Sequence, residues 1–110
     1  MAATTITSTM LNNLRQRVVD MVSYAQYKIG GTWYRAEINR KEIRSNGSVH
    51  ISFYIPVPAS IETPASQFRL FDTGGNILAE RTENVPFAQN IEKILFLFKF
   101  GVSVGSASQE

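Results

Sequence analysis

The stretch from Gln67 to Arg81, QFRLFDTGGNILAER, constrains the fold more than any other part of this 110-residue chain. Phe68 and Leu70 alternate with polar neighbours, and the apolar residues after residue 76 alternate in the same way, with the period of two typical of half-buried strands. The five residues between, DTGGN, include two glycines that adopt a positive φ at little cost. The pattern predicts an antiparallel hairpin with one apolar face.

Strand-like alternation recurs in four other parts of the chain, over residues 24–29, 32–38, 49–55 and 91–104. Gly30-Gly31 separates the first two of these segments, which indicates a second tight hairpin. Asn46-Gly47 precedes the third segment and is a strong hairpin signal in its own right. The charged residues between the second and third segments are interpreted as a connection that leads to this turn.

Two proline-bearing segments interrupt the predicted strands. Residues 56–66 are long for a hairpin loop, so they predict a crossover between two sheets. Residues 82–90, around Pro86, are expected to form a second irregular loop. The final segment, 91–104, is apolar on both faces in its first half, which predicts a central strand that is covered on both sides.

An amphipathic helix is predicted before the first strand, beginning near Ser8 or Thr9, whose hydroxyl groups can cap free backbone N–H groups. Apolar residues follow at spacings of three and four: Leu11, Leu14, Val18 and Met21. This stripe fits a helix that docks on its own domain. It also fits a seam that meets the same helix in neighbouring subunits.

These patterns together predict a mainly β fold, an antiparallel β-sandwich of about seven strands preceded by one N-terminal α-helix. Residues 8–104 are expected to form a single domain, with the helix over 8–22 and the β-sandwich over 23–104. Residues 1–7 are expected to be a flexible N-terminus and residues 105–110 a polar tail.

The composition is that of an ordinary globular protein, with 44% hydrophobic and 18% charged residues and a formal net charge of +2. So small an excess of positive charge is weak support for nucleic-acid binding. The chain contains no cysteine, which fits a reducing cytoplasm or a particle assembled there. The N-terminus lacks the pattern of a signal peptide, and the apolar run 94–98 is too short for a membrane span, so no membrane insertion is expected.

The sequence offers few residues for catalysis. His50 is the sole histidine, so a metal site would lack the further His or Cys ligands that it needs. Asp72 belongs to a turn, where its side chain is expected to accept backbone N–H groups. We therefore expect no enzymatic activity, no catalytic residues, no metal and no cofactor.

Two binding functions remain as alternatives. Exposed aromatic rings at Trp33, Tyr24 and Tyr54 would suit a carbohydrate-binding module that recognises a cell-surface glycan. The basic residues Arg35, Arg40, Lys41 and Arg44 would suit a nucleic-acid surface. Glu37 and Glu42 interrupt that basic cluster, which favours a mixed, solvated face and no nucleic-acid partner.

The hairpin over residues 68–80, with its strand ending in LFD, its Gly-Asn turn and its ILA return strand, resembles a module of bacteriophage tail proteins. Tail-fibre, tail-collar and baseplate proteins are similar in this hairpin and in a closing amphipathic strand, here residues 96–104. The preceding helix, the 24–38 hairpin and the 49–55 strand also fit, so that the resemblance covers residues 8–104. Those proteins are usually longer, whereas here the module makes up nearly the whole sequence.

The resemblance implies a non-enzymatic structural or adaptor subunit of a phage tail or baseplate. Such a subunit would be located in the virion, after assembly in the host cytoplasm. Its expected partners are copies of itself, as a trimer or hexamer, and other tail proteins. On this hypothesis the apolar stripe of the helix contributes to a subunit interface, and the loops 56–66 and 82–90 contact neighbouring tail proteins.

Overall fold

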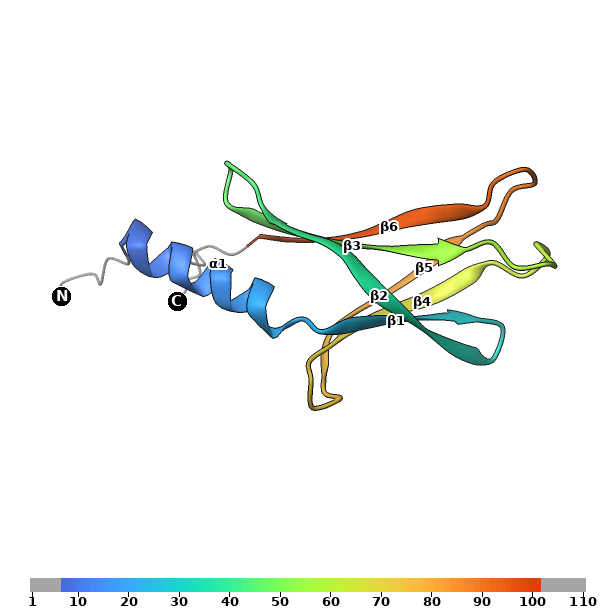
Figure 1. Ribbon diagram of the computed structural model, residues 1–110, viewed down its shortest axis with the longest axis horizontal. Helices are drawn as coiled ribbons and strands as arrows, with labels where there is room; N and C mark the ends of the chain where they lie inside the picture. The colour runs from blue at the N-terminus through green and yellow to red at the C-terminus, as the bar shows by residue number, and fades with distance from the viewer. Residues whose placement is uncertain (1–6, 102–110) are drawn as a thin grey trace.

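The computed structural model describes residues 7–101, which form one α-helix and six β-strands (Figure 1). In chain order the elements are α1 (Ser8–Met21), β1 (Tyr24–Ile29), β2 (Thr32–Ile43), β3 (Ser48–Pro56), β4 (Ala65–Phe71), β5 (Ile77–Val85) and β6 (Lys93–Gly101). The mainly β fold with a preceding helix is thus confirmed. The predicted polar tail, the last residues of the 91–104 segment and residues 1–6 lie outside the described residues.

The described strands form one antiparallel sheet in the order β5-β4-β1-β2-β3-β6, rather than the expected sandwich of about seven strands. The long strand β2 explains the difference. Its first part, up to Glu37, pairs with β1, and its last part, from Ile38, pairs with β3. The register shifts between Ile38 and Arg40, and such a bulge bends a strand and increases its twist. One sheet therefore curls over and takes the place of two.

Curling brings the two halves of the sheet face to face around a shared core. The ring of Phe68 on β4 stacks on the ring of Phe96 on β6, with centroids 3.8 Å apart. Phe53 on β3 packs against Phe96 and Phe98 on the same inner face. Phe87, from the segment that follows β5, is also buried in this core. The apolar alternation predicted from the sequence is what fills the interior.

Three predicted features of the strands are wrong. β2 continues through the charged residues 39–43, because side chains on its outer face remain solvated while its backbone pairs with β3. β5 extends to Val85, where the sequence had predicted a loop from residue 82. β6 lies at the edge of the sheet and not at its centre, and its outer face is not covered, since Leu95 and Leu97 are 54% and 40% exposed.

The two predicted hairpins around residues 30–31 and 72–76 are present, as is the one at residues 46–47. The segment 56–66 joins β3 to β4, which belong to different halves of the curled sheet. It is therefore a crossover rather than a hairpin loop, as its length had predicted, but it joins two parts of one sheet and not two sheets.

Helix α1 begins at Ser8, as predicted, but its capping residue is one position earlier than expected. Thr7 is the N-cap, and its Oγ1 accepts a hydrogen bond from the backbone N–H of Met10 at 3.2 Å. The helix ends at Met21, and the next residue, Val22, is buried in the core. Lys41 on β2 donates a hydrogen bond from Nζ to the carbonyl of Val22, which fixes the end of the helix to the sheet.

A second contact holds the middle of α1. The guanidinium of Arg15 lies over Gly47 in the β2–β3 turn, so that a Cβ at Gly47 would be 2.5 Å from Nη2. Gly47 also has a φ of +89°, which side chains with a Cβ rarely adopt. Anchored in this way, the helix lies at one end of a molecule that measures 60 × 28 × 25 Å (Figure 1).

We expect Gly47→Ala to lower the free energy of unfolding by about 1–2 kcal/mol, because the new Cβ strains a left-handed backbone and displaces Arg15. Urea denaturation followed by circular dichroism measures this change. Gly31→Ala is the matched control, since no atom lies within 4 Å of the new Cβ and its φ is not left-handed. Equal stability of the two variants would contradict the role given to Gly47.

Candidate interaction surfaces

Helix α1 presents an apolar face that its own sheet does not cover. No residue of the helix is fully buried, although Val18 and Val19 pack partly against the core. Met10, Leu14 and Met21 are 53%, 41% and 50% exposed. Their spacing of four and seven residues places all three along one side of the helix.

The predicted stripe is therefore divided between two environments. Val18 packs on the domain's own core and Leu11 is half-buried, whereas Leu14 and Met21 are exposed. Met10 joins the exposed residues and was missed, although its helical spacing from Leu14 was visible in the sequence. One side of the helix packs on its own domain and the other side is exposed to solvent. The two interpretations of the stripe are therefore compatible.

An apolar hollow of about 220 Å³ adjoins this exposed face. Val18 and Met21 from α1 line it together with Leu70 from β4, Leu78 from β5 and Phe100 from β6. It is smaller than the roughly 300–1,000 Å³ of typical small-molecule sites. A large apolar side chain from a partner is a better match for its size and lining.

The two proline-bearing segments lie side by side at the end of the sheet away from α1 (Figure 1). Val57 and Ile61 from the first segment and Ala88 and Gln89 from the second line an open groove, together with Ile91, which follows the second segment. A hydrogen bond of 2.9 Å from the backbone N–H of Val57 to the carbonyl of Glu92 joins the two chain segments. The segments expected to contact neighbouring proteins thus form one continuous surface.

The three aromatic residues considered for glycan binding do not form a common platform. Arg69 covers one face of the Trp33 ring, with Cζ 4.2 Å from its centroid. Tyr24 is enclosed more tightly, since it stacks on Phe71 and lies under Arg35. The third, Tyr54, belongs to β3, in the other half of the sheet.

The ring of Tyr54 also makes a cation–π contact, because Nζ of Lys93 lies 4.2 Å from its ring centroid. These rings are thus engaged in cation–π contacts, which are attractive in themselves. Sugar stacking would have to displace these cations or use the opposite faces.

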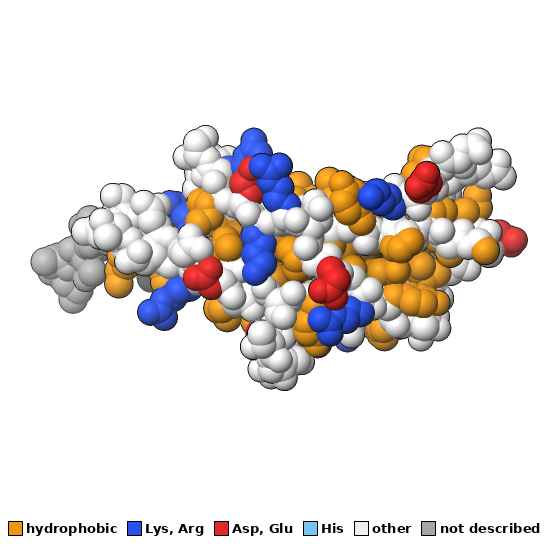
Figure 2. All heavy atoms as spheres, viewed as in Figure 1, with side chains coloured by type: hydrophobic (Ala, Val, Ile, Leu, Met, Phe, Trp, Pro, Cys, Tyr) orange, Lys and Arg blue, Asp and Glu red, His pale blue; other side chains and the backbone are white. Residues whose placement is uncertain are grey.

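The basic residues of the predicted mixed face are each engaged with a neighbour. Arg35 pairs with Glu37 at 3.0 Å, and Lys41 is bonded to the helix end. Glu42 accepts from both Arg40 at 3.0 Å and Arg44 at 2.9 Å. Figure 2 shows basic and acidic side chains interspersed with hydrophobic ones over the visible face. This arrangement supports the interpretation as a mixed surface over that of a nucleic-acid surface.

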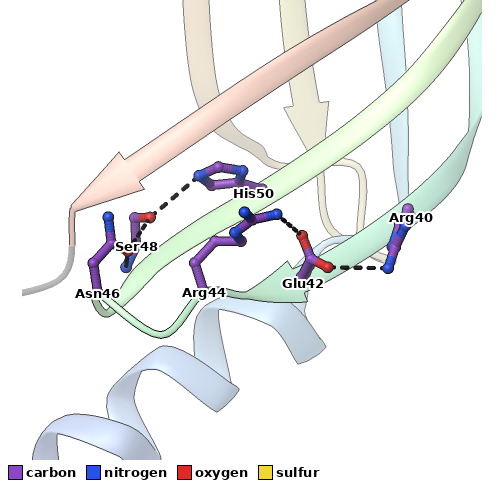
Figure 3. A network of polar contacts seen from close by, with 6 residues as sticks. All are labelled: Arg40, Glu42, Arg44, Asn46, Ser48 and His50. Atoms are coloured by element: carbon purple, nitrogen blue, oxygen red, sulfur yellow. Dashed lines mark hydrogen bonds and ion pairs between the residues drawn. The ribbon is translucent and has the colours of Figure 1, made fainter.

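The polar network at the β2–β3 hairpin contains the only histidine of the sequence (Figure 3). The hydrogen bond from Arg44, with the charge of Arg40, holds the pKa of the Glu42 carboxyl below its ordinary value. Asn46 Oδ1 accepts hydrogen bonds from the backbone N–H of Ser48 at 3.0 Å and from its hydroxyl at 2.7 Å. The same hydroxyl oxygen lies 3.2 Å from Nε2 of His50.

A serine nucleophile would need to give its proton to His50, and the histidine would need a carboxylate to orient it. Here the hydroxyl of Ser48 donates to Asn46, and both oxygens of Glu42 are used by arginines. The network therefore acts to hold the turn in place. Within residues 7–101, no group of three or more His, Cys, Asp or Glu side chains is placed to bind a metal ion.

Asp72 organises the hairpin that dominates the sequence. Its Oδ1 accepts hydrogen bonds from the backbone N–H groups of Gly74 and Asn76, each at 2.9 Å. The N–H of Asn76, its side-chain amide and the amide groups of the glycines hold the pKa of the Asp72 carboxyl below its ordinary value. This carboxylate has a structural role, as the sequence predicted.

Comparison with known proteins identifies no relative: no family matches the chain, and no significant match is found among curated proteins or solved structures. The phage-tail resemblance therefore stays a hypothesis. Among the described residues, no helix has both the length and the apolar character needed to cross a bilayer.

We expect Asp72→Ala to destabilise the protein at neutral pH and to have less effect in acid. The ordinary pKa of an aspartate is about 3.8, and that of folded Asp72 is lower. Its stabilising contribution is therefore fully present above the ordinary pKa and is lost as the pH falls through the folded-state pKa. Thermal melts of both proteins between pH 7 and pH 2 measure this convergence. A melting-temperature difference that does not change with pH would contradict it.

Proposed function

We propose that this protein is a non-enzymatic structural or adaptor subunit of a phage or phage-like tail or baseplate, which assembles through protein–protein contacts. The observation that carries the proposal is the apolar face of α1, formed by Met10, Leu14 and Met21, which its own sheet leaves exposed. Apolar side chains gathered along one side of an exposed helix are typical of an interaction surface.

The helix is well suited to present this face in a fixed direction. Lys41 fixes its C-terminal end to β2, and Arg15 fixes its middle to the β2–β3 turn. Leu14 and Met21 are seven residues apart, as in the seam of a coiled coil, and Met10 extends the seam toward the N-terminus. The hollow beside Met21 can accept an apolar side chain from the neighbouring copy.

The opposite end of the molecule supports an adaptor role. The two proline-bearing segments meet there in one groove, whereas α1 lies at the other end (Figure 1). In this proposal the helices join copies of the chain into a trimer or hexamer, and the groove contacts other tail proteins. The curled sheet between them serves as the rigid, sandwich-like module of the subunit.

Replacement of Leu14 by aspartate tests the helical interface. We expect Leu14→Asp to convert the oligomer to a monomer, because a charge at the centre of an apolar seam loses its solvation when copies meet. Size-exclusion chromatography with light scattering measures the mass. Asn13→Asp adds the same charge outside the apolar face and should leave the oligomer intact. A wild-type protein that is monomeric at high concentration would contradict the interface.

Location in a tail is tested separately. Phage particles that carry an epitope tag at the C-terminus of this chain should bind a gold-labelled antibody at the tail or baseplate in electron micrographs. Label on the capsid, or purified particles that lack the protein, would refute the tail assignment. Tail genes beside the coding sequence would support it.

A further inference from the structure

The outer strands of the curled sheet, β5 and β6, each have an edge that pairs with no other strand among residues 7–101. Each strand is nine residues long. β6 is apolar on its inner face, and its outer face carries the exposed residues Leu95 and Leu97. A long edge with apolar residues and no paired strand favours pairing with another strand.

Within one chain these edges approach each other without forming a ladder. Arg81 on β5 lies over the ring of Phe96, and its Nη1 is 3.4 Å from the carbonyl oxygen of Leu97. That distance is longer than the usual 2.7–3.2 Å of a protein N–H···O bond. The side chain of Arg81 thus occupies part of the β6 edge, and a strand from another copy that pairs with β6 there must displace it.

The charges of the two edges are complementary. β6 carries Lys93 and Lys99 and no acidic residue, whereas β5 carries Glu80 and Glu83 with Arg81. These acidic side chains are about half exposed, at 52% for Glu80 and 43% for Glu83, and each pairs with an arginine of its own chain: Glu80 with Arg69 at 3.4 Å and Glu83 with Arg81 at 2.6 Å. Two β6 strands would bring like charges together, whereas β6 against β5 brings opposite charges together.

The direction of the strands also fits. Every neighbouring pair in the sheet is antiparallel, and with six strands the two outer ones run in opposite directions. If β6 of one copy lies beside β5 of another, the antiparallel alternation continues across the interface. Placing Lys99 opposite Glu80 sets Leu97 opposite Thr82 and Leu95 opposite Asn84 on the outer face.

We infer that β6 of one copy pairs with β5 of a second copy of this chain. Because this contact joins different surfaces, it is head-to-tail, and successive contacts generate a closed ring where the rotation allows. This inference deepens the proposed function by naming a sheet-edge partner for the subunit. It concerns a surface separate from that of α1.

The absence of native cysteine allows a direct test by disulfide formation between single-cysteine variants. Thr82→Cys and Leu97→Cys are purified separately, mixed, and oxidised gently. We expect covalent dimers that contain one copy of each variant, identified by the mass of the linked peptides. Each variant alone should give at least about fivefold less dimer, since antiparallel partners directly opposite each other lie much closer than diagonal ones.

Leu95→Cys is the matched control, because Leu95 is on the same face of β6 and is more exposed than Leu97, but it lies one pair away from Thr82 in this register. It should give a lower yield with Thr82→Cys than Leu97→Cys does. Glu80→Lys in the Thr82→Cys chain should lower the yield about threefold, and Lys99→Glu in its Leu97→Cys partner should restore it. Dimers of Leu97→Cys alone at the yield of the mixture, or no mixed dimer, would overturn the inference.

The same reaction in the Leu14→Asp background separates the two surfaces. Mixed dimers that persist there show that edge pairing does not depend on α1. If mixed dimers form but purified phage particles do not contain the protein, this inference stands and the tail assignment fails. Tail label without mixed dimers would do the reverse.

Discussion

The stacking of Phe68 on Phe96 is the contact on which the arrangement of this protein depends. A single sheet can shield one face from water only by curling over it, and these rings close the two halves of the sheet at a centroid distance of 3.8 Å. The bulge in β2 between Ile38 and Arg40 supplies the bend. Curling buries the apolar face but does not close a barrel, so β5 and β6 keep their edges.

The helix adds a second constraint. Val22 is buried in the core, so the C-terminal end of α1 must lie against the sheet, and Lys41 and Arg15 hold it there. A helix tied down along one side cannot turn its remaining apolar residues inward. Met10 and Leu14 are therefore exposed as a consequence of how the helix is anchored, and in the proposed assembly a partner covers them.

The sequence predicted what depends on local pattern and missed what depends on strand pairing. Alternation around Phe68 and the glycines of the turns predicted the strands and hairpins, because side-chain burial and positive φ leave local signals. The segment around Leu95 has apolar residues on both faces, and this pattern predicted a central strand. That pattern reports which side chains avoid water, and it does not tell whether a neighbouring strand comes from the same chain. The exposed position of Leu14 depends on contacts of Arg15 with Gly47, which no local pattern shows.

The same reasoning connects the misplaced strand to assembly. The edge of β6 has unpaired backbone groups, and in the inferred contact β5 of another copy would pair with them in the antiparallel direction. β5 and β6 run between the two ends of the molecule, where α1 and the proline-bearing segments lie (Figure 1). Lateral edges suit contacts around a ring, and the ends suit contacts along its axis. Because these exposed apolar groups lie on separate surfaces, copies of the chain could assemble both around a ring and along its axis, with a different surface for each contact.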